Sequence, residues 1–127
     1  MGADYGGRSI TVIAGATLTG YEHYPVVQES SGKVTLADSA GELTLGVLES
    51  GGTITDGREC RVRIGGTALV ITGAAVDEGA ELSANASGKL VTASAGDYVA
   101  GIALEPGSGD GDVIRVKMVC YQKNPAS

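Results

Sequence analysis

Few residues in this chain have the types and spacing that chemistry requires. There is one histidine, His23 in GYEHYPVV, so any site that needs two imidazoles is excluded. A Ser-His-Asp site of the hydrolase type also needs a G-x-S-x-G turn to expose its serine, and that turn is missing. We therefore expect His23 to be a surface or strand-edge residue, and we expect that the protein is not an enzyme.

The two cysteines, Cys60 and Cys120, lack the C-x-x-C spacing of redox and metal sites. Both fall on the apolar face of a segment that alternates in polarity, where cysteine commonly acts as a small apolar residue. We predict two buried thiols. A disulfide would require the two residues to be adjacent in space, which their spacing in the sequence does not determine, so their pairing stays open.

Two kinds of segment have part of an ion-binding signature. Asp110 and Asp112 in EPGSGDGDV are spaced like the start of a calcium loop, but an EF-hand needs a third ligand where Ile114 stands. The two SGK tripeptides lack the flanking residues of a phosphate-binding loop. We interpret these segments as a hairpin connection and as tight turns with solvated Lys33 and Lys89, and we predict no metal and no cofactor.

The composition limits the class of protein. A chain of 127 residues with 43% hydrophobic and 19% charged residues is typical of one folded domain. Its 21 glycines, with no Trp and no Phe, favour short strands joined by glycine turns. The net charge of -6 argues against nucleic-acid binding. No segment approaches the ~18 apolar residues of a membrane span, and the N-terminus lacks the regions of a signal peptide, so we expect a protein made in the cytoplasm with no membrane partner.

The elements that position these residues occur twice. SSGKVTLADSAGELTLGVLE, residues 30–49, has a near copy in ASGKLVTASAGDYVAGIALE, residues 86–105. The alignment places Gly46-Val47 on Gly101-Ile102, and Asp56-Gly57 on Asp110-Gly111. In each copy the glycine of SGK suits a tight turn, because glycine adopts the positive φ that such turns require. The repeat predicts two similar β-meanders that pack around a shared core.

Alternation with a period of two predicts the strands. Cys60 and Val62 share a face in one strand, as Val116 and Cys120 do in another. The expected strands are 9–13, 24–28, 43–49, 58–64, 67–72, 98–104 and 112–118, with two more beginning at Val34 and Leu90. The segment AAVDEGAEL has room for one helical turn. The fold class is all-β, a small Gly-rich barrel or sandwich built from two meanders.

The expected organisation is a flexible N-terminal arm at 1–8, a single β domain at 9–123, and a C-terminal tail at 124–127. The internal repeat covers about 24–66 and 80–120. The arm lies outside the repeat and is rich in glycine.

The run GKLVTASAGDYVAGIALEPGSGDGDVIRVKMV resembles the C-terminal signature of a family of tailed-phage capsid decoration proteins, also called capsid cement or head-stabilising proteins. The upstream run YPVVQESSGKVTLADSAGELTLGVLESGG resembles the family through the same kind of turn and strand pattern. The resemblance spans residues 21 to 120 and is carried by turn and strand patterns rather than by catalytic residues.

The resemblance implies a β-barrel or β-tulip body that forms a homotrimer. It also implies binding to the major capsid protein on the outer surface of the virion, at threefold and quasi-threefold points of the expanded head, where the trimer resists the pressure of packed DNA. The N-terminal arm would then become ordered against the shell. Tyr5 and Arg8 are the candidate anchors, because these residue types are enriched at binding hot spots. Ser9 and Ile10 complete the candidate capsid-binding set.

Two other classes remain open. A carbohydrate-binding or adhesin-like module would use aromatic side chains as platforms for sugars, and the chain offers five Tyr, including Tyr21 and Tyr24, and no Trp. A small β-barrel enzyme or accessory subunit lacks visible catalytic residues.

Overall fold

A computed structural model describes residues 8–124, and this part of the chain is built from strands without a helix. The strands are β1 (Ser9–Ile13), β2 (Leu18–Thr19), β3 (Pro25–Gln28), β4 (Val34–Leu36), β5 (Gly46–Leu48), β6 (Thr53–Ile54), β7 (Glu59–Arg63), β8 (Thr67–Ile71), β9 (Glu81–Ala84), β10 (Leu90–Thr92), β11 (Tyr98–Ala103) and β12 (Val113–Gln122). The prediction of an all-β fold is confirmed.

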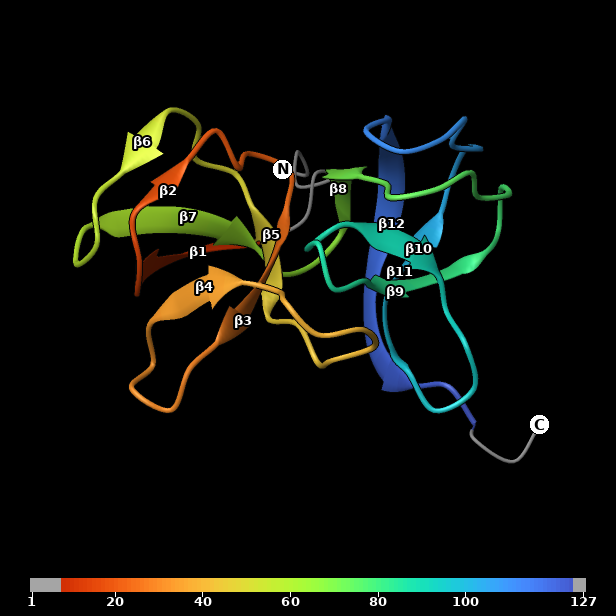
Figure 1. The fold of residues 1–127 in the computed structure, drawn as a ribbon, viewed down its shortest axis with the longest axis horizontal. Helices are drawn as coiled ribbons and strands as arrows, with labels where there is room; N and C mark the ends of the chain where they lie inside the picture. The colour runs from red at the N-terminus through yellow and green to blue at the C-terminus, as the bar shows by residue number, and fades with distance from the viewer. Residues whose placement is uncertain (1–7, 125–127) are drawn as a thin grey trace.

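The strands form two halves that lie side by side (Figure 1). The first half contains a five-stranded sheet in the order β1-β7-β5-β3-β4, and the second half contains a sheet in the order β8-β12-β11-β9-β10. Strand by strand these orders are the same, and every pairing between named strands is antiparallel. The sequence repeat therefore corresponds to a repeated topology, and the correspondence includes β1 and β8, which lie outside the residues aligned by sequence.

Hydrogen bonds fix the correspondence residue by residue. The His23 amide donates to the Leu48 carbonyl at 2.8 Å, and the Gly79 amide donates to the Ala103 carbonyl at 2.7 Å. His23 therefore has Gly79 as its counterpart, and both have a positive φ, of 77° and 85°. A positive φ is uncommon outside glycine, so the repeated backbone geometry places His23 where a glycine would fit without strain.

Each five-stranded sheet curls without closing into a barrel. Ala14, just after β1, makes a single parallel bridge to Val34 at the start of β4, and Thr72 makes the same bridge to Leu90 in the second half. One bridge does not continue the sheet, so each half is an open, strongly curled sheet. Of the two predicted alternatives, the sandwich-like arrangement describes the fold and the closed barrel does not.

The two halves share one of the two apolar cores. The first core lies within the first half and contains Leu48 and Val62 among its buried residues. The second core is built mostly from β8 to β12, but Ala37 and Val47 of the first half are also buried in it and Val27 packs against it. The first half therefore covers part of the core of the second half.

Strand β12 begins with the predicted alternation and then loses it. Ile114 and Val116 are buried, as predicted. The register of β11 with β12 shifts between the Val99–Tyr121 pair and the Gly101–Met118 pair, which marks a β-bulge. Because an extra residue reverses the side-chain alternation, Cys120 is exposed, and the prediction that it is buried is wrong. Cys60 is buried as predicted, and both thiols are free.

Other strands differ from the prediction mainly in length. The expected strand 43–49 is reduced to β5, and Leu43 to Leu45 belong to a loop whose Gly41 forms hydrogen bonds with Ala84 and Tyr98 of the second half. The segment AAVDEGAEL forms a turn at Asp77 rather than a helical turn, and its last residues enter β9. Strands β2, β6 and β9 were not predicted. The first two are only two residues long, which is too short for a period to be visible.

We predict that Gly46→Ala destabilises the fold by about 2–3 kcal/mol, because its Cβ would overlap the Arg63 carbonyl oxygen where β5 pairs with β7. Gly109→Ala is the matched control, since nothing lies within 4 Å of the added Cβ there, and its free energy of unfolding should change by less than about 1 kcal/mol. Urea titration of both variants measures the difference. Equal stability of the two variants would contradict the close approach.

We predict that one thiol reacts quickly with a thiol reagent in the native protein, and that the second reacts only after denaturation. Cys120 is exposed, whereas burial of Cys60 both shields its thiol and raises its pKa. The count of labelled thiols before and after adding denaturant checks this. In the control variant Cys120→Ser, native labelling should disappear, and rapid native labelling of that variant would contradict the burial of Cys60.

Candidate functional site

The residues that the sequence offered for chemistry are engaged in the fold. His23 is partly buried at the seam between the halves, where its carbonyl accepts a hydrogen bond from the Ile71 amide at 3.0 Å. Its imidazole lies 3.8 Å from Glu22, which is half exposed. The expectation of a strand-edge residue fits this position, and the backbone of His23 links the two halves.

The acidic glycine-rich turn is held by its own hydrogen bonds. Asp112 accepts hydrogen bonds from the Ser108 amide at 3.0 Å and from the Val113 amide, and these bonds outweigh desolvation and lower the pKa of Asp112. Asp110 forms an ion pair with Lys89 at 2.9 Å. Lys33 is solvent-exposed as predicted, but Lys89 is only partly exposed because of this ion pair, so the expectation of a solvated Lys89 is wrong.

Within residues 8–124, no group of three or more His, Cys, Asp or Glu side chains is arranged to hold a metal ion. In the same residues no helix has the length and apolar character needed to span a membrane. Tyr21 and Tyr24 are neighbours, with ring centroids 5.0 Å apart and planes at 82°. Both rings are partly buried in this edge-to-face pair, so neither offers an open platform.

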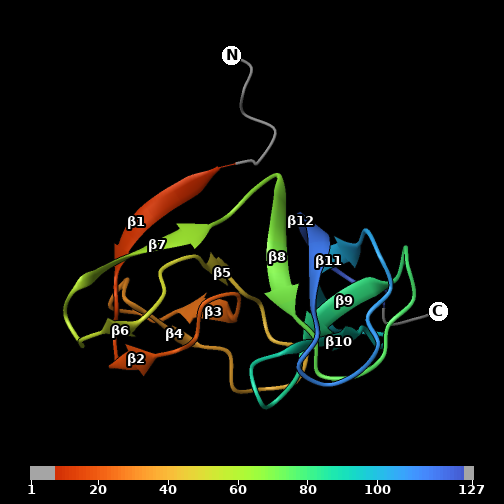
Figure 2. The same ribbon diagram turned by 90° about the horizontal axis from the view of Figure 1, so that it is seen from above.

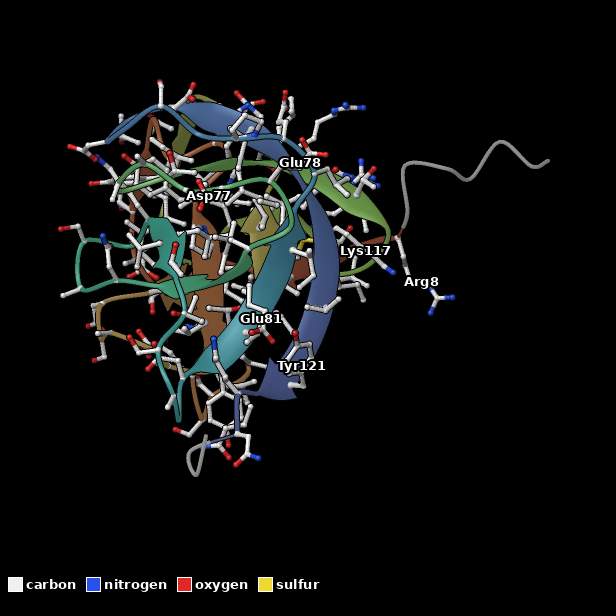
Figure 3. All side chains as sticks on the ribbon, turned by 90° about the vertical axis from the view of Figure 1, so that its right-hand side faces the viewer. Arg8, Asp77, Glu78, Glu81, Lys117 and Tyr121 are labelled. Atoms are coloured by element: carbon white, nitrogen blue, oxygen red, sulfur yellow. The ribbon has the colours of Figure 1, made fainter. Side chains whose placement is uncertain are left out.

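The four residues of the N-terminal candidate site have different environments. Tyr5 lies outside the described residues. Arg8 is exposed, and its carbonyl accepts a hydrogen bond from the Ile64 amide at 2.8 Å. Figure 3 shows the Arg8 side chain extending away from the body of the protein on the side where Lys117 lies. Ser9 and Ile10 belong to β1, where Ser9 donates to Glu49 and Ile10 packs against the first core. Of the described members, only Arg8 presents a free side chain to a partner.

Glu49 is the centre of the most connected polar cluster. It accepts hydrogen bonds from the Ser9 hydroxyl at 2.5 Å and from Arg63 at 2.8 Å, and it also lies 3.9 Å from Arg61. Partial burial raises the pKa of Glu49, but these hydrogen bonds and the two positive charges outweigh burial, so its pKa lies below the usual value. The cluster ties β1 and β7 to the end of β5.

A second set of contacts fixes the C-terminal end of β12. The Tyr121 hydroxyl donates to Glu81 at 2.6 Å, and the Lys123 ammonium lies 3.1 Å from the same carboxylate. These bonds lower the pKa of Glu81 and raise that of Tyr121. Figure 3 shows Glu81 and Tyr121 close together on the outward side of the second sheet.

The outward side of the second sheet also exposes large apolar side chains. Leu69 is 47% exposed, Val113 is 40% exposed and Leu104 is 36% exposed. They surround Arg115, which is paired with Leu69 across the strands and whose backbone carbonyl accepts a hydrogen bond from the Leu104 amide. This outward face combines apolar and basic side chains, as a protein-binding surface does.

The phage cement protein family model matches residues 7–118, which is most of the chain. The chain belongs to the phage cement protein family. No curated protein has significant sequence similarity to it. Among solved structures, it is similar to "The crystal structure of head fiber gp8.5 N base in bacteriophage phi29", with a TM-score of 0.62 and 18% identity, over 88% of this chain and 93% of that chain. This likeness shows that the fold is shared.

Membership of the cement protein family confirms the resemblance and supports a structural role in association with the phage capsid. The cluster around Glu49 and the outward face of the second sheet were not predicted from the sequence. A signal was present for the second, because Leu104 and Val113 are apolar at positions where the first copy has Glu49 and Glu59.

We predict that Glu49→Gln lowers the free energy of unfolding by about 1 kcal/mol at pH 7. Because folding depresses the pKa of Glu49, its charge contributes stability above the usual carboxyl pKa of about 4.3, and this contribution is lost as the pH falls through the lower folded-state pKa. The difference between wild type and variant should therefore shrink below about pH 4. Urea titrations from pH 7 to pH 3 measure it, with the exposed Glu59→Gln as control. A difference that is constant with pH would contradict the assignment.

Proposed function

We propose that this protein is a capsid cement protein that binds the outside of the expanded phage head as a homotrimer, at threefold and quasi-threefold sites. Bound there, it contacts the major capsid protein and strengthens the shell against the pressure of the packed DNA. The observation that carries this proposal is the family match over residues 7–118. The protein would be made in the host cytoplasm and added to the outer surface of the virion.

Three physical features support this role. The described residues show curled sheets without a metal-binding cluster, which suits a protein that acts through its surfaces. The net charge of -6 favours solubility at the high copy number that a shell requires. Many identical weak contacts on a symmetric lattice give strong total binding through avidity.

We further propose that the N-terminal segment contributes to shell binding, with Tyr5 and Arg8 as anchors and with Ser9 and Ile10 holding the start of β1. Arg8 supports this proposal because its backbone is fixed to Ile64 while its side chain is exposed. Arginine forms charge-assisted hydrogen bonds with carboxylates and stacks on aromatic rings, so it suits a protein partner. Ser9 and Ile10 contribute by fixing where the segment leaves the body.

Co-sedimentation with phage heads tests the proposed function. We expect saturable binding to undecorated expanded heads, near one trimer per threefold site, and no binding to unexpanded procapsids of the same phage. Stoichiometry is measured by gel densitometry of the pelleted heads. If neither particle binds the protein, the cement role is wrong.

Two variants test the N-terminal segment. Deletion of residues 2–7, which leaves β1 intact, and Arg8→Ala should each weaken binding to expanded heads without changing thermal unfolding. Arg58→Ala is the matched control, because Arg58 is also an exposed arginine but lies in the turn before β7. If both variants bind as tightly as this control, the N-terminal segment has no role in shell binding.

A further inference from the structure

The two halves of the chain pack head to tail. Strand β8, which begins the second half, lies along the outward side of the first sheet, next to β5 (Figures 1 and 2). Two hydrogen bonds hold it there: the Ile71 amide donates to the His23 carbonyl at 3.0 Å, and Arg63 donates to the Thr67 carbonyl at 3.1 Å. The outward side of the first sheet is thus covered by the first strand of the next half.

The repeated topology places counterparts of His23 and Arg63, the two residues that bind β8, on the second sheet. The face that carries them is called the receiving face. Gly79 stands in the position of His23, and Lys117 stands in that of Arg63, because β12 corresponds to β7. Ile102 and Leu104 correspond in the same way to Val47 and Glu49. Within residues 8–124 no strand covers the receiving face of the second sheet, and Gly79, Leu104 and Lys117 are exposed.

The covering strand β8 also has a counterpart, β1, that covers no sheet within residues 8–124. Strand β1 corresponds to β8, and each stands at the end of its sheet's strand order. The Ala14 amide donates to the Arg58 carbonyl in the partner turn, so by the alternation of an antiparallel ladder the Ile13 amide points away from β7. One copy of the chain therefore has one uncovered receiving face and one free covering edge, and free strand edges are sites for pairing.

The outward faces of the two sheets differ in polarity. Three positions that are polar in the first sheet are exposed and apolar in the second: Thr11 corresponds to Leu69, Glu49 to Leu104, and Glu59 to Val113. Contact within a chain needs little extra stabilisation, because the two halves are already joined. Contact between separate molecules loses translational and rotational freedom, so it requires additional apolar burial. Of the three, Leu104 lies where the covering strand would pass, because Arg63 bonds both to Glu49 and to the Thr67 carbonyl of β8 in the first half. Thr11 and Glu59 are exposed there.

The repeated contact favours a second copy as the occupant. Lys117 stands in the position of Arg63, which donates to the carbonyl of the covering strand, and β1 is the strand that corresponds to that covering strand. Arg115 is already paired with Glu105, whereas Lys117 has no ion pair among the described residues.

We infer that the outward face of the second sheet binds β1 of a second copy of this chain, repeating the head-to-tail contact found between the halves. The Gly79 carbonyl accepts the Ile13 amide of the second copy, and Lys117 donates to the Ser9 carbonyl of that copy. A head-to-tail contact leaves no unused face only when it closes into a ring. The inference rests on the homotrimer of the proposed function and does not depend on the capsid as a partner.

The variant Leu104→Glu tests this face. The change introduces the residue that the first sheet already has at the corresponding position, so the fold is expected to tolerate it. Light scattering after size exclusion should give a mass of three chains for the wild type and of one chain for the variant, with association weakened at least tenfold, or about 1.4 kcal/mol. Leu43→Thr, which changes the most exposed large apolar residue outside this face, is the control and should stay assembled.

Hydrogen exchange provides a second readout that does not depend on the variant folding. The Ile13 amide should exchange slowly in the assembled wild type and faster on dilution to the monomer. A monomeric wild type, an assembled Leu104→Glu variant, or an unprotected Ile13 amide in the assembly would each overturn the inference. A monomer that still saturates expanded heads would overturn this face and leave the proposed shell binding intact, whereas an assembled protein that binds no heads would do the reverse.

Discussion

The structure depends on the burial of one half of the chain against the other. A half of this size buries only a modest fraction of its surface and is marginal alone. Here the second core is completed by Val47 and Ala37 of the first half, with Val27 packed at its side. The backbone links at His23 and Arg63 hold β8 in the same interface. Apolar burial, which contributes about 25 cal/mol per Å² of buried surface, therefore stabilises the interface as well as the two sheets. The halves are expected to unfold together.

The comparison of the two halves separates what the fold requires from what the surface is free to change. Gly46 and Gly101 both stand where a Cβ would overlap the neighbouring strand, so the fold requires a glycine twice. The hydrogen bond from Gly57 to Ala14 has its copy from Gly111 to Thr72, at 2.9 and 2.8 Å. The outward faces do not follow this rule, since charged and polar positions of one sheet are apolar in the other. Interior geometry is therefore fixed by packing, while the outward faces reflect contacts that differ between the halves.

This separation explains what the sequence could predict. Strands such as β1 and β7 were predicted nearly at their observed bounds, because one buried face imposes a period of two on them. The burial of Cys120 was predicted wrongly because a bulge in β12 is set by pairing with β11, which a single strand's pattern does not contain. Lys89 was expected in solvent because its partner, Asp110, is distant in sequence and meets it only in the fold. In the candidate site, the exposure of Arg8 was accessible from sequence, but the cluster around Glu49 depends on three segments that only the fold brings together.

The relation to the head fiber base fits the same reasoning. The two chains share a fold over most of their lengths at 18% identity. Such divergence is tolerated when only apolar character, turn glycines and strand register must be kept, because cores accept many substitutions that conserve volume. Under the proposed cement function, the protein acts through repeated surface contacts, so it has no single arrangement of catalytic groups to preserve, and avidity lets each contact be modest. Its surface can therefore change with its partner while the duplicated interior stays the same, and the functional residues are to be sought where the two halves differ rather than where they agree.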